Sequence, residues 1–349
     1  MASQRDASAI RYVGRYRLLR RLAVGGMAEV FVAERAGPSG GSPLALKCIL
    51  PQHAAVGEFV DMFLAEARIA GMLRHENIVR TYEFGMVDGE YFIVMELLAG
   101  LTVRKLSDGY TRRGTHLPRP AAVAIVRAIA AGLNYAHERC DAEGAPLGIV
   151  HRDVSPQNVI VTRHGGVKLL DFGIAKSSAR IDATREGALK GKLRYMSPEQ
   201  CRGVADRRSD VFACGLILYE LTLGRSAYRG KSDEELFACA LEARYEPPRS
   251  IDPSYPAELE AVIACALQPA PEDRHPSGAA LAADLAIAAR SLGPPATAAV
   301  LAELVADEQA SVSAVEAMIA AEQSGRARAA TIELEDGTHT DLDSIELLA

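Results

Sequence analysis

Several features that mark other protein classes are missing from this 349-residue chain. Its formal net charge is −6, so it lacks the basic excess of a general nucleic-acid binder. Its six cysteines form no C-x-x-C pair and no cluster with histidines, which indicates reduced, mostly buried thiols. The strongest apolar run, residues 211–224, is too short to span a bilayer and contains Glu220. We therefore expect a soluble, cytoplasmic protein that binds no nucleic acid and has no membrane span.

The beginning and the end of the chain differ from its middle in composition. The first residues are polar and Arg-rich, unlike a signal peptide. Residues 293–349 contain eleven acidic residues against only Arg326 and Arg328, a charge of −9. Because the whole chain carries −6, residues 1–292 carry +3. The sequence thus predicts a mildly basic body followed by an acidic, partly helical or disordered tail.

Hydrophobic periodicity divides the body into two parts. Between Tyr16 and Leu98, apolar residues alternate in five short runs that predict strands: "YRLLRRLAVGG", "AEVFVAERA", "LALKCIL", "VRTYEFGMV" and "YFIVMELL". One amphipathic helix is expected among them, over residues 58–75. Beyond Gly100 the pattern becomes helical, with helices predicted near 120–139, 210–224, 258–268 and 277–292. A small strand-rich lobe followed by a larger helical lobe is therefore expected.

Two features of the strand-rich part are compatible with phosphate binding. The turn "LAVGGMAEVF", residues 22–31, contains glycines, which let backbone N–H groups lie close over phosphates. A Gly-Gly hairpin without any ligand fits the same letters. Lys47 lies on the third predicted strand and Glu66 in the predicted helix, where the two could pair beside a phosphate. As isolated charges, both would be ordinary surface residues.

The helical part carries stronger signals. "HRDVSPQN" (151–158) contains Asp153 and Asn158, and "DFG" (171–173) begins with Asp171. Magnesium prefers hard oxygen ligands, and an aspartate with an asparagine carbonyl would provide two. Asp153 is a further carboxylate that can accept a proton from a hydroxyl nucleophile. "YMSPEQ", "SDVFACG" and "PEDRHPS" follow in order. Any one of these motifs could occur by chance, but all of them in this order and at this spacing could not.

In these motifs the chain resembles a eukaryotic-type Ser/Thr protein kinase of the bacterial branch. The resemblance covers residues 14–292 and implies an α+β, bilobal protein kinase fold. The N-lobe would be 14–98, with strands and one key helix, and the mainly helical C-lobe 99–292. Residues 1–13 would be an N-terminal extension and 293–349 the C-terminal tail. The implied activity is phosphorylation of serine and threonine hydroxyls on proteins, including autophosphorylation, with ATP and Mg²⁺.

The resemblance also implies which residues contact ATP. The phosphate-covering loop would comprise Leu22, Ala23, Val24, Gly25, Gly26, Met27, Ala28, Glu29 and Val30. Lys47 would pair with Glu66 and hold the α- and β-phosphates. Met95 would be the gatekeeper at the back of the adenine pocket, with Glu96 and Leu98 in the hinge.

By the same resemblance, Asp153 would be the catalytic base, and Asn158 and Asp171 would hold magnesium. Three further residues would have architectural roles: Glu199 and Arg274 as a buried ion pair, and Asp210 as the residue that holds the catalytic loop. Ala23 and Ala28 stand where the family usually has glycines, which predicts a somewhat stiffer phosphate loop.

One departure affects the chemistry. Ser155 stands where typical Ser/Thr kinases carry a lysine that contacts the transferring phosphate. Tyrosine kinases place an arginine two positions later, where this chain has Gln157. Lys192, however, replaces the threonine that usually packs against the catalytic Asp. With only 7 lysines against 32 arginines, a generic surface charge would more often be arginine. We predict that Lys192 supplies the missing ammonium; the alternative is a lysine that faces solvent or acidic substrates.

Regulation and partners are predicted from the same resemblance. Arg152 would bind a phosphorylated residue of the activation segment, for which Thr184 is the favoured acceptor. The stretch "RARAATIEL" around Thr331 is interpreted first as an ordinary linker in the acidic tail; the alternative is an autophosphorylation site at Thr331 that docks a phosphothreonine-reading partner. Self-association for trans-autophosphorylation is another expected interaction, besides protein substrates.

Three other function classes are alternatives at this point. A pseudokinase would lack Lys47, Asp153 or Asp171, and all three are present. A signalling scaffold acting through the C-terminal tail would keep its role without phosphotransfer. A small-molecule kinase would share both lobes but lack an activation segment closed by Ser-Pro-Glu, which here ends at Glu199.

Overall fold

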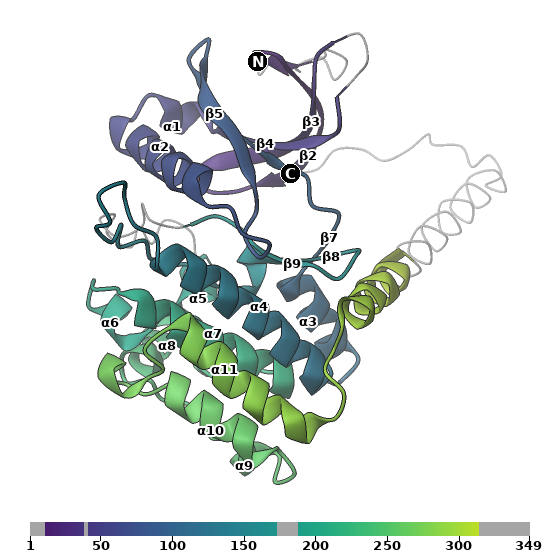
Figure 1. Cartoon of the computed structure of the whole chain (residues 1–349), viewed down its shortest axis with the longest axis vertical. Helices are drawn as coiled ribbons and strands as arrows, with labels where there is room; N and C mark the ends of the chain where they lie inside the picture. Colours follow the sequence, from purple (N-terminus) through teal and green to yellow (C-terminus); the bar gives the residue numbers. More distant parts are fainter. Residues whose placement is uncertain (1–10, 38–40, 173–187, 314–349) are drawn as a thin grey trace, which may run out of the picture. The chain divides into compact units, whose positions relative to one another are not determined.

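The computed structural model describes residues 11–37, 41–172 and 188–313 (Figure 1). Residues up to Val305 form one compact unit, in which a strand-rich lobe precedes a helical lobe. This arrangement confirms the α+β, bilobal fold expected from the sequence. Thr184 and Thr331 lie outside the described residues.

The N-lobe contains a six-stranded sheet in which every neighbouring pair is antiparallel. In spatial order its strands are β1 (Tyr12–Val13), β2 (Tyr16–Val24), β3 (Ala28–Arg35), β4 (Leu44–Ile49), β6 (Glu90–Glu96) and β5 (Thr81–Val87). The five predicted strands are all present, and β1 is an addition too short to show a hydrophobic pattern. The last strand along the sheet, β5, is an edge strand.

Alternating side chains give this sheet two apolar faces. One face forms a small core around Phe31, Leu46 and Val94. The other face, which includes Ile49 and Ile93, is covered by α2 (Gly57–Met72), the helix predicted over 58–75. A one-turn helix, α1 (Pro51–Ala54), precedes α2. Lys47 of β4 therefore lies in the same sheet that α2 covers, which brings the strand close to Glu66.

A second, three-stranded sheet lies between the N-lobe sheet and the helices. It consists of β7 (Gly100–Thr102), β8 (Val159–Thr162) and β9 (Val167–Leu169), in that order. The hairpin of β8 and β9 follows the catalytic loop directly and leads to Asp171. This hairpin thus joins the two motifs that contain Asn158 and Asp171, which lie thirteen positions apart in the sequence.

The C-lobe is built around α7 (Arg207–Leu223), whose residues from Ser209 to Thr222 are all buried. Asp206 caps its N-terminus and Gly224, with φ of 67°, ends it in the left-handed conformation. The other helices are α3 (Val103–Arg112), α4 (Arg119–His137), α5 (Ala188–Leu193), α6 (Pro198–Cys201), α8 (Asp233–Leu241), α9 (Pro248–Ile251), α10 (Ala257–Ala266) and α11 (Gly278–Ala288). Short 3₁₀ turns occupy Pro156–Asn158, Pro271–Asp273 and Ala289–Leu292. Among the described residues, none of the helices has the length and hydropathy needed to cross a membrane.

The structure extends the compact unit beyond the composition change at residue 292. Residues 298–313 are helical, and Leu301 and Val305, one turn apart, are buried in the main core. The charge of −9 over residues 293–349 as a whole hides these two apolar positions. The first part of the predicted tail therefore packs against the kinase-like body, up to Val305.

Substitution of Gly165 tests this packing. Gly165 has φ of 78°, and a Cβ there would lie 1.8 Å from the carbonyl oxygen of Ala298. Gly144 has a similar φ of 87° but open space around the Cβ position. We expect Gly144→Ala to lower the free energy of unfolding by about 1 kcal/mol, the cost of a left-handed alanine. Gly165→Ala should cost about 1–3 kcal/mol more because of the overlap. Equal losses in denaturant unfolding would show that residues 298–305 do not pack against this turn.

Candidate active site

Lys47 joins the two lobes at the proposed phosphate site. Its Nζ lies 2.6 Å from Oε1 of Glu66 on α2 and 3.0 Å from Oδ1 of Asp171 after β9. The Lys47 side chain is 12% exposed, so these contacts are only weakly screened by water. Burial alone would lower the pKa of Lys47, but the carboxylates of Asp171 and Glu66 raise it well above its usual value. The lysine therefore stays charged at any physiological pH and can contact an anionic ligand.

The catalytic loop is held by one buried carboxylate. Asp210, 1% exposed at the start of α7, accepts hydrogen bonds from the backbone N–H of His151 (2.8 Å) and of Arg152 (2.9 Å). The imidazole Nε2 of His137, at the end of α4, lies 2.8 Å from the same carboxylate. Arg152 has a φ of 66°, an unusual conformation for arginine that these bonds stabilise. Asp210 thus holds the loop, as the sequence predicted.

Asp153 and Asn158 are joined at the centre of this loop. The amide nitrogen of Asn158 donates to the backbone oxygen of Asp153 at 2.8 Å and to its Oδ2 at 3.1 Å. Since both amide hydrogens are used there, the carbonyl oxygen of Asn158 is left as an acceptor. The N–H of Leu170 donates to the backbone oxygen of Asn158 at 2.8 Å, which brings the position before Asp171 beside Asn158.

These groups fit a magnesium ion. The Asn158 carbonyl and the Asp171 carboxylate are hard oxygen donors at the adjoining ends of β8 and β9, and Mg²⁺ usually takes one or two such groups together with phosphate and water. Asp171 has a φ of 37°, so the chain turns sharply where its carboxylate meets Lys47. The described residues contain no cluster of three or more His, Cys, Asp or Glu side chains that could hold a metal without a phosphate ligand.

The glycine-containing turn lies between β2 and β3. The N–H of Gly25 donates to the oxygen of Ala28 at 2.8 Å, and His53 of α1 lies 3.0 Å from the oxygen of Gly26. Ala23 and Ala28 are not among the described residues with a positive φ, so alanine at these two positions costs nothing in backbone conformation here. A Cβ at Gly26 would meet no atom within 4 Å. The open space above this turn leaves its backbone accessible to a ligand.

The predicted gatekeeper and hinge residues form the link between the lobes. Met95, at the end of β6, is half-buried and packs against the α2 face of the sheet. The carboxylate of Glu96 is 2.7 Å from Nζ of Lys168 on β9 and also accepts from the backbone N–H of Arg80. The Glu96 carboxylate is therefore already bound by these two groups. A nucleotide base in this region would contact the backbone of residues 96–98 rather than this side chain. Leu98 is half-buried in this link.

The end of the activation segment is attached to the catalytic loop and to the C-lobe. Gln200 donates to the backbone oxygen of Arg152 at 3.0 Å. Glu199 forms a bidentate pair with the buried Arg274, at 2.7 and 2.8 Å, as predicted. Burial would raise the pKa of Glu199, but the bonds from Arg274 and Ser209 lower it. Glu199 therefore stays charged and the pair fixes the segment's end.

Lys192 lies in α5, a few residues before this attachment, with an exposed side chain. Its backbone oxygen accepts from the N–H of Tyr195 at 3.1 Å. Ser155, which stands where the family usually has the lysine, is buried in the catalytic loop. Its backbone oxygen accepts a hydrogen bond from the N–H of Asn158 at 3.0 Å. The structure thus places Lys192 on the segment that meets the catalytic loop.

Sequence analysis missed a three-residue cluster below this segment. Arg104 of α3 pairs with the buried Glu220 of α7 at 2.8 Å, and the hydroxyl of Tyr195 contacts both. Burial raises the pKa of Tyr195, so the hydroxyl stays protonated and donates to Glu220. Arg104 lies 91 positions before Tyr195, and Tyr195 lies 25 positions before Glu220, so no local sequence pattern indicates that the three side chains meet. The cluster fastens the activation segment to two helices.

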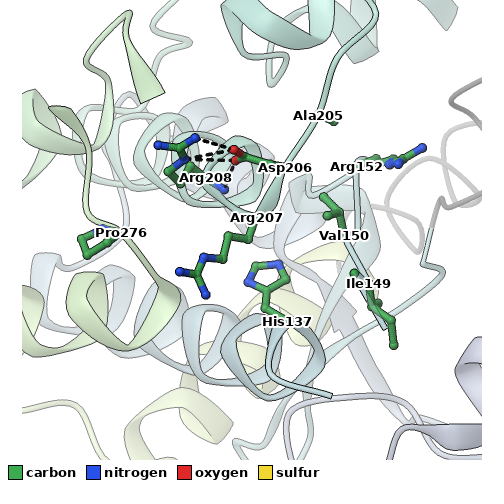
Figure 2. Close-up of a pocket in the computed structure, with 10 residues that line it drawn as sticks. His137, Ile149, Val150, Arg152, Ala205, Asp206, Arg207, Arg208 and Pro276 are labelled. Carbon is green, nitrogen blue, oxygen red and sulfur yellow. Dashed lines mark hydrogen bonds and ion pairs between the residues drawn. The ribbon is translucent and has the colours of Figure 1, made fainter. Parts of the chain in front are cut away.

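A cavity of about 480 Å³ lies behind the catalytic loop, between the end of α4 and the start of α7. Figure 2 shows Arg207 beside His137 in this cavity and Arg208 paired with Asp206, whereas Arg152 extends to the opposite side. Nε of Arg152 is buried, and among the described residues it has no hydrogen-bond partner. The cavity contains none of the residues assigned to ATP or magnesium, so it is separate from the nucleotide site.

Comparison with known proteins agrees with this geometry. The family model described as "Protein kinase domain" matches residues 16–285. The tyrosine-protein kinase MasK of Myxococcus xanthus is 42% identical over 271 residues, which are 77% of this chain and 42% of MasK. The serine/threonine-protein kinase PrkC of Bacillus subtilis is 33% identical over 276 residues, 79% of this chain and 40% of PrkC. The chain thus spans about two-fifths of the length of these relatives.

Solved structures show the same fold. The crystal structure of the PknI kinase domain of Mycobacterium tuberculosis superposes with a TM-score of 0.61 and 28% identity. The match covers 82% of this chain and all of that domain. A family model that spans most of the chain, a relative with 42% identity and a matching fold lead to one conclusion: the chain belongs to the protein kinase family.

Proposed function

We propose that this protein transfers the γ-phosphoryl group of ATP to serine and threonine hydroxyls of proteins. The observation that carries the proposal is the convergence of Lys47, Glu66 and Asp171 at one point, beside the joined pair of Asp153 and Asn158. Positioning and charge stabilisation account for most of phosphoryl transfer catalysis, and this arrangement supplies both.

Each residue has a distinct role in the proposed reaction. Lys47 contacts the α- and β-phosphates, while Glu66 keeps the lysine in place. Asn158 and Asp171 would hold Mg²⁺, which neutralises phosphate charge when bound. The backbone of the loop from Leu22 to Val30 covers the phosphates.

The chemical step forms one bond and breaks another. The substrate hydroxyl oxygen bonds to the γ-phosphorus, and the bond from that phosphorus to the β–γ bridging oxygen breaks, which releases ADP. Asp153 accepts the hydroxyl proton. Asn158 orients Asp153, since its amide group binds both the backbone and the carboxylate of that residue.

Tyrosine is the second candidate acceptor, because MasK, with 42% identity, is named a tyrosine-protein kinase. Against it, the chain has Gln157 where tyrosine kinases carry an arginine in the catalytic loop. PrkC, at 33% identity, is named a serine/threonine-protein kinase. Because position 157 is a glutamine, we favour serine and threonine as the acceptor residues.

We infer a further role for Lys192, namely to supply the ammonium that Ser155 does not. The attachment of Gln200 to Arg152 and of Tyr195 to Glu220 holds the segment that carries Lys192 against the catalytic loop. A lysine side chain has the length and the compact charge to contact Asp153 and the γ-phosphate. A cytoplasmic location remains part of the proposal, and a partner that reads phosphorylated Thr331 remains the alternative to an ordinary linker.

The full chain should autophosphorylate with labelled ATP and Mg²⁺, and the label should be found on serine and threonine. Asp153→Asn should lower the rate by about 10²–10⁴-fold, because the proton acceptor is lost. Asp61→Asn, the same change at an exposed position of α2, is the control and should retain full activity. Label confined to tyrosine would contradict the acceptor class.

The same assay distinguishes an enzyme from a scaffold. A chain that shows no phosphotransfer to itself or to generic protein substrates, although it binds ATP, would act as a pseudokinase. A chain that lacks residues 314–349 should retain its rate, since the compact unit ends before them.

Replacement of Lys192 tests its proposed charge role. Lys192→Ala should lower kcat by about 10²-fold with little change in the KM for ATP, because the contact acts in the transition state. Lys192→Arg should have a kcat little higher than that of Lys192→Ala, since a planar guanidinium does not replace a compact ammonium.

The double variant Ser155→Lys with Lys192→Thr restores the family's usual residues. It should exceed Lys192→Thr alone by about tenfold, because residues that act as a unit are non-additive. A double variant no faster than the single one would mean that Lys192 has another role.

Activation by phosphorylation is supported by Arg152, whose buried Nε has no hydrogen-bond partner among the described residues. Thr184→Ala should slow autophosphorylation, and Arg152→Ala should slow it similarly. If phosphorylated Thr184 acts through Arg152, the double variant should be no slower than either single one. Wild-type speed for Thr184→Ala, with no phosphate found in the segment by mass spectrometry, would contradict this regulation.

A further inference from the structure

Both peptide units that flank Asp153 are held by side chains. In the unit before it, the C=O of Arg152 accepts a hydrogen bond from Nε2 of Gln200 at 3.0 Å. The N–H of the same unit, which belongs to Asp153, donates to Nδ1 of His151 at 3.2 Å. In the unit after it, the C=O of Asp153 accepts from the amide of Asn158 at 2.8 Å. Because peptide units are planar, their orientations set φ and ψ of Asp153.

The imidazole of His151 is itself held in one orientation. His151 is fully buried, and its Nε2 lies 2.8 Å from the backbone oxygen of Leu170. A carbonyl oxygen only accepts and a backbone N–H only donates, so Nε2 carries the proton and Nδ1 accepts from Asp153. The N–H of the peptide unit is thus held by the catalytic loop itself and by the residue after β9.

Gln200 holds the C=O of this unit from outside the catalytic loop. Its Oε1 accepts from the backbone N–H and from the hydroxyl of Ser197, each at 3.1 Å. Since the N–H of Ser197 can only donate and the C=O of Arg152 can only accept, the amide has one possible orientation. Both the oxygen and the nitrogen of the Gln200 amide are therefore used.

Arg152 has a backbone conformation that needs support on both sides. Its φ of 66° lies in the left-handed region, which is unfavourable for arginine. A residue keeps such a conformation only where its surroundings determine it. Asp210 binds the N–H of Arg152 at 2.9 Å, and Gln200 binds its C=O. Without Gln200, the described residues would hold the peptide unit before Asp153 only at its N–H.

The position of Gln200 is fixed by its neighbour in the chain. Glu199 forms the bidentate pair with Arg274, whose side chain is fully buried. Arg274 also donates to the backbone oxygens of Gln268 and Pro269, at 2.6 and 2.8 Å. Gln200 therefore extends from a rigid part of the C-lobe, and a side chain on such a base can position a reacting group precisely enough for catalysis.

The local helix does not explain why this residue is a glutamine. Gln200 is the third residue of α6, where it closes a capping box with Ser197. Glutamate closes such a box equally well, and its charge is favoured in the first turn of a helix. Glutamate has no N–H, however, and cannot donate to the C=O of Arg152. The amide is therefore required by the catalytic loop and not by α6.

We propose that Gln200 is a positioning residue for Asp153, which couples the end of the activation segment to the orientation of the base. A displacement of α6 would rotate the peptide unit before Asp153 and turn its carboxylate away from the substrate hydroxyl. The inference rests on the proposed function, in which Asp153 accepts the hydroxyl proton. The hydrogen bonds of Gln200 go to Ser197 and Arg152 and not to residues assigned to ATP, so ATP binding should be preserved.

Two variants of Gln200 separate positioning from helix capping. Gln200→Glu removes the donor and keeps the acceptor, and it should lower kcat by about 10–100-fold with little change in the KM for ATP, because a small misplacement of a reacting group has costs of that order. Gln200→Met removes both halves of the amide at a similar volume and should be no slower than Gln200→Glu. A role limited to capping α6 predicts the reverse order, since Gln200→Glu would keep the cap.

Amide hydrogen exchange of residues 150–158, measured by mass spectrometry without nucleotide, tests the inference independently of phosphotransfer. Gln200→Glu should speed exchange there by about fivefold or more, because the loop opens more often. Gln268→Glu is the matched control: Gln268 is half-buried, and its amide donates to the backbone oxygen of Ala264 at 3.2 Å. This control should leave both kcat and the exchange of residues 150–158 unchanged.

The two readouts assign failure to different claims. Exchange at the wild-type rate in Gln200→Glu would overturn the inference, whether or not the chain is active. Wild-type kcat for Gln200→Glu in an active chain would overturn it equally. A chain that is inactive in every form, Gln268→Glu included, would contradict the proposed function, and hydrogen exchange alone would then decide whether Gln200 holds the loop.

Discussion

The contact of Lys47 with Glu66 and Asp171 is the interaction on which this arrangement depends. Lys47 belongs to the sheet, Glu66 to the helix that covers it, and Asp171 to the helical lobe, so a single ammonium group ties three elements together. The charges are partly shielded from water, and removal of the ammonium would take away the cation that both carboxylates contact. In the proposed reaction the same lysine contacts the phosphates, and its strand β4 pairs with β3, the strand that follows the glycine-containing turn.

A second buried charge organises the other half of the site. Asp210 accepts hydrogen bonds from two backbone N–H groups of the catalytic loop and contacts an imidazole, and it lies on α7, whose residues from Ser209 to Thr222 are all buried. The loop's unusual backbone at Arg152 is stabilised by these bonds rather than by local sequence preference. Lys47 therefore connects the two lobes, whereas Asp210 fixes the backbone of the loop that carries Asp153 and Asn158.

The N-lobe sheet fixes the position of Lys47 relative to α2. Lys47 lies on β4, an inner strand between β3 and β6, and α2 packs on the face of the sheet that includes Ile49 and Ile93. A displacement of α2 relative to the sheet would therefore change the contact between Lys47 and Glu66 directly.

The sequence by itself determined the two-lobe plan, the five strands, the main helices and the motif residues, because periodicity and motif order are local properties of the chain. Tertiary structure alone decided which distant residues meet. The cluster of Arg104, Tyr195 and Glu220 joins three elements without any shared local signal. Leu301 and Val305 belong to the core although acidic neighbours mask them in the composition. Burial and pairing of this kind depend on packing between elements, which no local pattern records.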